Sequence, residues 1–213
     1  NGKGQPQPTG ILINKNSQDI KIKNCRFKNI IDTNKGNQSH AIYLSNVKDV
    51  EVSECTFEMD YKFSFNENGS GGFQIFRGNN HNINIHDNLF RNVTSNLHNS
   101  SKLVFKNNIL ENARVKVATD NALIQKNKFQ LTTEGGYVGL LRTAGYPKNV
   151  IIEKNIFKDS SNSKSYSYAI QLYGNAANFT IKENVIENFH TGILLGQARE
   201  KKDISNCTIT KNK

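Results

Sequence analysis

The chain has 213 residues, of which 36% are hydrophobic, and carries a formal net charge of +10. Its apolar residues recur in a regular pattern and never run to about 18 in a row, which excludes a disordered chain and a membrane-spanning helix. The basic residues lie singly and no nucleic-acid-binding or zinc-ligand motif is visible, so nucleic acid and zinc are not expected, although the charge favours an anionic partner.

One short pattern recurs along the chain: two apolar residues that flank a polar one, polar positions, an Asn, and then a large apolar residue. In chain order the copies are IKIKNCRF (20–27), VEVSECTF (50–57), INIHDNLF (83–90), LVFKNNIL (103–110), ALIQKNKF (122–129), VIIEKNIF (150–157) and FTIKENVI (179–186), with an eighth starting at CTITKN (207–212). The alternation and the β-branched residues predict short strands with one buried face, and no segment keeps a helical period.

The spacing of the copies predicts a solenoid. Successive copies start 19 to 33 residues apart, which suits coils that stack at about 4.8 Å. A propeller blade needs four strands in about 40 residues, and a leucine-rich repeat needs a Leu-dominated consensus, so both rivals fit less well. We therefore predict an all-β solenoid of about eight coils.

A polar position lies between the two strands of each copy. It is occupied by Cys25, Cys55, Asn88, Asn108, Asn127, Asn155, Asn184 and Asn212. Because Asn tolerates a left-handed backbone, we expect this residue to make the bend and its amide to hydrogen-bond from coil to coil. A second column, expected to end the next strand in the same way, comprises Asn29, Asn92, Asn112 and Asn188. Cys25 and Cys55 would be neighbours, as buried free thiols rather than as a disulfide.

A third strand completes each coil. Its segments are GILI (10–13), AIYLS (41–45), FQIFRG (73–78), VKVAT (115–119), LLRT (140–143), AIQLYG (169–174) and GILLG (192–196). With this coil pattern and its Asn ladder, the chain resembles the right-handed parallel β-helix superfamily of pectate and other polysaccharide lyases, glycosidases, uronan epimerases and phage tailspikes. The resemblance covers nearly the whole chain and is specific for the fold, whereas catalytic residues differ among members.

The domain organisation follows from the coils. We expect residues 1–213 to form a single β-helix domain. Because uncapped solenoid ends expose unpaired backbone, and neither end shows a capping helix, we expect a fragment of a longer chain. The sequence starts at Asn1, so any signal peptide is removed or lies outside it. The resemblance implies a place outside the cell, on its surface or in a virion.

In the resembled enzymes, the substrate lies along the outside of the third strand. Aligning that strand places basic and aromatic side chains on one outward face. The predicted substrate-binding residues are Tyr43, Gln74, Phe76, Arg77 and Gln171, because sugar rings stack on aromatics and uronate carboxylates pair with Arg. An ordinary solvated sheet surface is the open alternative. Short coils near Asn108 and Asn127, between long insertions at 28–40, 58–71 and 158–167, predict a notch over Lys116.

A lyase reaction would use three of these outward groups. β-Elimination on a uronic acid needs a neutralised carboxylate, a base for the C5 proton and an acid for the leaving oxygen. We assign Lys116 as the base, Arg142 as the neutralising group and Tyr173 as the proton donor. This assignment requires burial or neighbouring cations to lower the pKa of Lys116.

Other chemistries find less support in the sequence. Only Asp120 lies near this face and Glu134 in a loop, so a calcium-dependent mechanism is not expected and no cofactor is firmly implied. A glycosidase needs two carboxylates, and Asp60 with Glu67 is the nearest pair, with Glu58 as a third group. Turn or surface positions are expected for His40, His81, His86, His98 and His190.

The sequence thus predicts a β-helix that processes or binds an anionic polysaccharide, with a lyase favoured over a hydrolase if it is an enzyme. The alternative is a non-catalytic structural or adhesive β-helix that binds glycans, such as a tailspike shaft or a bacterial surface protein. A shaft implies a homotrimer with exposed apolar patches, whereas an enzyme implies a groove with converging cations.

Overall fold

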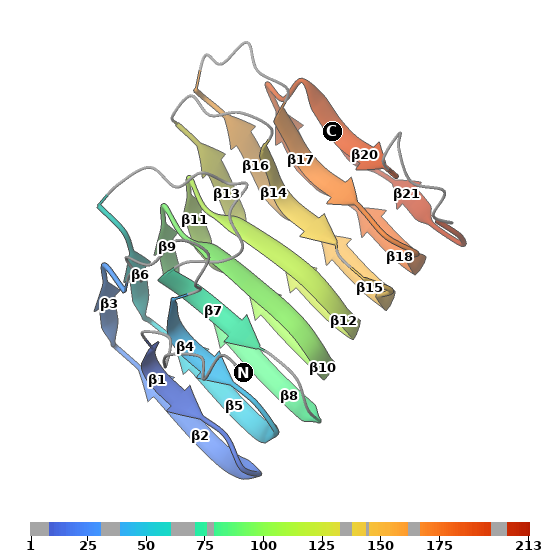
Figure 1. Ribbon diagram of the computed structural model, residues 1–213. Helices are drawn as coiled ribbons and strands as arrows, with labels where there is room; N and C mark the ends of the chain where they lie inside the picture. The colour runs from blue at the N-terminus through green and yellow to red at the C-terminus, as the bar shows by residue number, and fades with distance from the viewer. Residues whose placement is uncertain are drawn as a thin grey trace, which may run out of the picture.

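The computed structural model describes residues 9–30, 39–60, 71–75, 79–132, 138–143, 145–161, 167–196 and 204–213 (Figure 1). For residues 71–74 and 138–139 only the backbone is described. Every regular element of this part of the chain is a β-strand. Among these residues there is no helix that is long and apolar enough to cross a bilayer.

Each coil has three sides. The first side is the strand that precedes the repeated pattern, predicted above as the third strand, and the second and third sides are the two strands of the pattern. The first-side strands are β1 (Thr9–Ile13), β4 (His40–Leu44), β7 (Gly71–Ile75), the first halves of β10 (Thr94–Lys106) and β12 (Arg114–Gln125), β14 (Val138–Thr143), β17 (Ser167–Leu172) and β20 (Thr191–Leu195). The second-side strands are β2 (Ser17–Lys23), β5 (Val47–Ser53), β8 (Asn80–His86), the second halves of β10 and β12, β15 (Lys148–Glu153), β18 (Ala177–Lys182) and β21 (Thr208–Thr210). The third-side strands are β3 (Arg26–Lys28), β6 (Thr56–Glu58), β9 (Leu89–Arg91), β11 (Ile109–Glu111), β13 (Lys128–Leu131), β16 (Ile156–Asp159) and β19 (Val185–Glu187).

All strand pairs between coils are parallel. The first and second sides form one 14-stranded sheet and the third side a 7-stranded sheet, so the strands stack from the N-terminal to the C-terminal coil as Figure 1 shows. Crossovers between parallel strands of one sheet wind right-handed. The chain is therefore a right-handed parallel β-helix, which confirms the predicted fold and its eight coils.

The Asn ladder is present as predicted. The Nδ2 group of each Asn donates to Oδ1 of the next, from Asn88 to Asn108 at 3.0 Å and from Asn127 to Asn155 at 2.9 Å. The same Oδ1 atoms also accept the backbone N–H of the residue one coil back, as Asn127 does from Asn108. At the N-terminal end Cys25 N–H lies 3.4 Å from Cys55 Sγ, and both thiols are free.

The position of the bend differs from the prediction. The left-handed backbone falls on the residue before the ladder residue, with φ between 53° and 56° at Asn24, Glu54, Asp87, Asn107, Lys126, Lys154, Glu183 and Lys211. The ladder side chain must point inward to meet its neighbours, so the mostly exposed residue before it takes the bend. The second Asn column does adopt positive φ, for example 54° at Asn92 and 49° at Asn112, as predicted.

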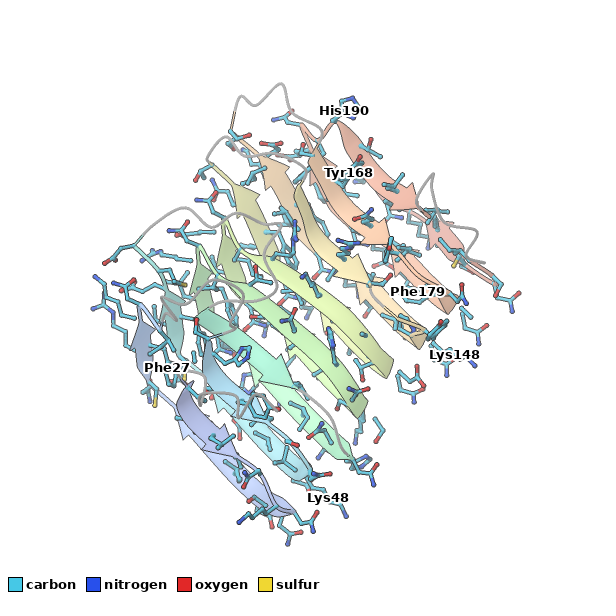
Figure 2. All side chains as sticks on the ribbon, viewed as in Figure 1. Phe27, Lys48, Lys148, Tyr168, Phe179 and His190 are labelled. Carbon is cyan, nitrogen blue, oxygen red and sulfur yellow. The ribbon has the colours of Figure 1, made fainter. Side chains whose placement is uncertain are left out.

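The large apolar residue of each pattern packs inside the third side. Phe27, Phe57 and Phe90 stack in succession, with ring centroids 5.0 and 4.8 Å apart. Phe129 and Phe157 form another stack at 4.6 Å. These rings are among the largest buried side chains, and Phe27 is labelled in Figure 2. The core thus runs along the axis, with one contribution from every coil.

Candidate functional site

Six positions on the outward face of the first side form one row across neighbouring coils, here called the outer row. In coil order they are Tyr43, Gln74, Asn96, Lys116, Arg142 and Gln171, each paired with the next in the strand register. Neighbouring positions of parallel strands lie about 4.8 Å apart. The outer row therefore brings residues from across about 130 positions of sequence into one continuous line.

Alternation along each strand sets which side chains face outward. Val115 and Val117 on β12 point into the core and are almost fully buried, so Lys116 between them points outward. Leu97 on β10 is buried in the same way, so the adjacent Asn96 occupies an outward position. The predicted outward positions of Tyr43, Gln74, Lys116, Arg142 and Gln171 are thus in register. Phe76 and Arg77 lie outside the described residues, and for Gln74 only the backbone is described.

Three cations meet in the middle of the outer row. Lys116 is paired with Arg142 across the strands, and Arg114 lies two residues earlier on β12 and is buried. Burial and the positive charges of Arg114 and Arg142 lower the pKa of Lys116 to about 8. Burial and the charge of Arg142 lower the pKa of Arg114 to about 10. This shift has the direction that the assignment of Lys116 as a base requires.

Arg142 is held between the sheet and an aromatic ring. Its guanidinium carbon lies 4.3 Å from the ring centroid of Tyr173, a cation–π distance. The backbone of Tyr173 is fixed by Thr143, whose Oγ1 accepts the Tyr173 N–H at 2.6 Å and donates to the Tyr173 carbonyl at 2.8 Å. Arg142 Nε is buried without a hydrogen-bond partner in the described part of the chain. The three residues assigned to catalysis thus lie together.

The contribution of β10 to the outer row was not predicted from the sequence. The segment TSNLH (94–98) forms a first-side strand, which places Asn96 beside Lys116 and His98 beside Ala118. Burial and the charge of Lys116 lower the pKa of His98. The signal for this segment is the coil interval, because residues 94 and 96 lie 20 positions before Arg114 and Lys116.

The expected turn or surface position is wrong for one histidine, His40. His98 lies within strand β10, on its outward side, and is only partly buried. His40 begins β4 and is buried, packed against Tyr43 with ring centroids 5.7 Å apart. Burial lowers the pKa of His40 to about 4, so this ring is neutral at physiological pH.

The alternative carboxylates are engaged elsewhere. Glu58 pairs with Arg26, and Asp60 accepts from Asn29 Nδ2 and pairs with Lys28. These contacts lower the pKa of Asp60, the opposite of what a catalytic acid needs. Glu67 and Glu134 lie outside the described residues. No group of three metal-ligating side chains is found among the residues that are described.

The predicted short coils are present. Strands β10 and β12 each run through two sides of a coil without a loop. A pocket of about 550 Å³ opens along them, with His98 and Ala118 in its wall. Lys116 is not among the residues that line this pocket, so the pocket lies one outward position beyond the place predicted for the notch. The insertions expected to flank it lie partly outside the described residues.

Comparison with known proteins gives one family. A family model described as a right-handed β-helix region matches residues 9–209. Among solved structures, that of the Streptococcus pneumoniae surface protein and adhesin PfbA aligns with 13% identity and a TM-score of 0.46, covering 96% of this chain and 66% of that one. No curated protein matches.

Proposed function

This chain belongs to the right-handed β-helix family, and on that premise we propose that it binds an acidic polysaccharide across the outer row and cleaves it by β-elimination. The observation that carries the proposal is the convergence of Arg114, Lys116 and Arg142 on one outward face. Like charges placed side by side destabilise a fold unless an anion joins them, so such a cluster is typical of a binding site. Neither Lys116 nor Arg142 is ion-paired within the described residues.

The reaction assigns one step to each group. Arg142 binds the uronate carboxylate and withdraws charge, which makes the C5 proton more acidic. Neutral Lys116 takes this proton, and the electron pair forms the C4–C5 double bond as the C4–O bond breaks. Tyr173 gives its proton to the departing oxygen. Because Lys116 is the base, the rate should rise as pH increases through about 8.

The test is incubation with a panel of uronic-acid polymers while the ultraviolet absorbance of the unsaturated product is followed. We expect absorbance to rise with at least one polymer, and the Lys116→Met variant to lose at least about a hundredfold in rate, the usual worth of a general base. Folding of the variant is checked by circular dichroism. Unchanged turnover in Lys116→Met would remove the assignment of the base.

A second candidate is an adhesive β-helix that binds a glycan without cutting it. The outer face of the third side favours it, because Ile109 and Ile156 are 43% and 42% exposed there, on either side of Lys128 in the strand register. Exposed apolar residues suit association of copies, as in a trimeric shaft. Glycan binding without product, together with a trimer in analytical ultracentrifugation, would select this candidate. Either function belongs outside the cell, on its surface or on a virion.

A further inference from the structure

The pocket beside the outer row lies where the first side turns into the second. Its wall includes His98 and Ala118, which follow Asn96 and Lys116 by two residues. Two residues of strand span about 7 Å, roughly the size of one sugar ring. The far wall is formed by Tyr146 and Pro147, just before Lys148, which Figure 2 labels at this end of the coils. A glycan bound over Lys116 can therefore place its next unit in the pocket.

The wall of the pocket has a different chemistry from the cationic cluster. Its polar groups are mainly hydroxyls and amides, from Ser100, Ser101, Thr119 and Asn121. Asp120 adds a carboxylate, whose Oδ1 accepts the backbone N–H of Lys148 at 2.8 Å. No Lys or Arg is among the described lining residues. An anionic unit would meet a like charge here, whereas sugar hydroxyls meet both donors and acceptors.

Two lining residues have polar atoms that lack partners. His98 Nε2 and Ser100 Oγ are buried without a hydrogen bond in the described part of the protein, and Ser100 as a whole is only 5% exposed. Leaving such atoms unpaired costs free energy. A ligand with hydroxyl groups could supply the missing partners. Tyr146 is 68% exposed and offers an aromatic surface for the apolar face of a sugar ring.

We propose that this pocket binds an uncharged sugar unit next to the acidic unit held by Lys116 and Arg142, so that the substrate alternates acidic and uncharged sugars. This inference rests on the proposed function and narrows its substrate class. The inference rests on two neighbouring surfaces. One is the cluster of Arg114, Lys116 and Arg142, and the other is the pocket wall with its hydroxyl groups and the Asp120 carboxylate.

Comparing two kinds of polymer tests the proposal. Hyaluronan and unsulfated chondroitin alternate a uronate with an uncharged amino sugar, whereas every unit of pectate and alginate is a uronate. We expect the full chain to bind the alternating polymers at least about tenfold more tightly in isothermal titration, the scale of about 1.4 kcal/mol. Equal or tighter binding of pectate or alginate overturns this inference and leaves the proposed function standing. Binding of none of the four overturns both.

Variants of the pocket residues test whether the pocket causes the preference for alternating polymers. Tyr146→Ala should weaken binding of the alternating polymers by up to about tenfold, and Tyr146→Phe, which keeps the ring, should bind as the unchanged chain does. Asp120→Asn retains an Oδ1 acceptor for the Lys148 N–H but removes the charge, so it should tighten the binding of pectate. If neither Tyr146→Ala nor Asp120→Asn changes binding, the pocket is not the second subsite. Tyr146 and Asp120 are exposed, so both variants should fold.

Discussion

Two rows of polar residues run across the coils, one inside the β-helix and one outside, and they obey opposite rules. In the inner Asn ladder each amide donates to one neighbour and accepts from the other, so all polar groups of Asn108, Asn127 and Asn155 are satisfied. In the outer row Lys116 and Arg142 repel each other, and burial together with the charges of Arg114 and Arg142 lowers the pKa of Lys116. The first row stabilises the fold, whereas the like charges of the second row destabilise it, and the proposed function gives the second row its use.

The largest effect should follow from breaking the inner row. Asn127→Ala removes four hydrogen bonds, two accepted from Asn108 and two donated to Phe105 O and Asn155 Oδ1. Because the partners are buried and lack water, we expect the free energy of unfolding to fall by about 3 to 4 kcal/mol. Urea denaturation measures this. A loss below about 1 kcal/mol would mean that the ladder contributes little to the stability of the fold.

Removing a charge from the outer row should raise the free energy of unfolding. Lys116→Met keeps the length of the side chain but removes one of three like charges, so we expect it to stabilise the fold by about 1 to 2 kcal/mol at pH 7, after solvent screening. Stability and glycan binding would then move in opposite directions. A destabilised Lys116→Met variant would show that the lysine is there for packing.

The pH dependence of stability provides a second measurement on the Lys116→Met variant. The folded pKa of Lys116, about 8, is lower than its ordinary value of 10.5, so the unfolded chain binds more protons between these values. The unchanged chain should therefore gain stability relative to Lys116→Met as pH rises from about 8 to 10.5. Below pH 8 the penalty for the charged lysine is fully present, and the difference between the two chains should be constant.

A smaller gain should come from extending the inner row. Cys55 holds a ladder position with weak contacts, because its Sγ lies 3.4 Å from Cys25 N and 3.7 Å from Ile22 O. Asn88 in the next coil meets the equivalent Val52 O at 3.0 Å through its Nδ2. Cys55→Asn should therefore stabilise the fold by about 1 kcal/mol. Thermal unfolding measures the shift, and a lower melting temperature would show that the amide does not fit there.

The smallest effect should come from a third row of Asn residues at the exposed turn. Asn178 donates to Asn149 at 3.0 Å and accepts from Asn206 at 3.2 Å, in contact with water. Asn178→Gly keeps the left-handed backbone, φ 57°, so we expect a change of less than about 0.5 kcal/mol. This variant is the control for Asn127→Ala, and a comparable loss would show that burial does not separate the two rows.

The sequence predicted the coils, the inner ladder and most outward positions, because a period of two and a recurring Asn are local signals. It assigned the bend to the ladder residue, because Asn adopts the left-handed region more readily than the Lys or Glu that often precedes it. Only the inward contacts of the amide place the bend one residue earlier. It did not predict the strand at 94–98, because this segment carries one strong apolar residue, Leu97, between polar ones. The lowered pKa of Lys116 depends on burial and on the charges of Arg114 and Arg142, and the burial and the position of Arg142 become visible only when the coils are stacked.

The spacing of the short coils also restricts how the length of this protein can change. Asn88, Asn108 and Asn127 are neighbours at intervals of 20 and 19 residues, and inner and outer side chains alternate along the strands between them. Inserting or deleting one residue within β12 would turn Lys116 inward and Val115 outward. Loss of the whole coil from 108 to 126 would instead leave Asn88 against Asn127, and it would remove Lys116 from the outer row together with the nearby Arg114. Length can thus vary in whole coils, and each coil that is gained or lost adds or removes one position of the outer row.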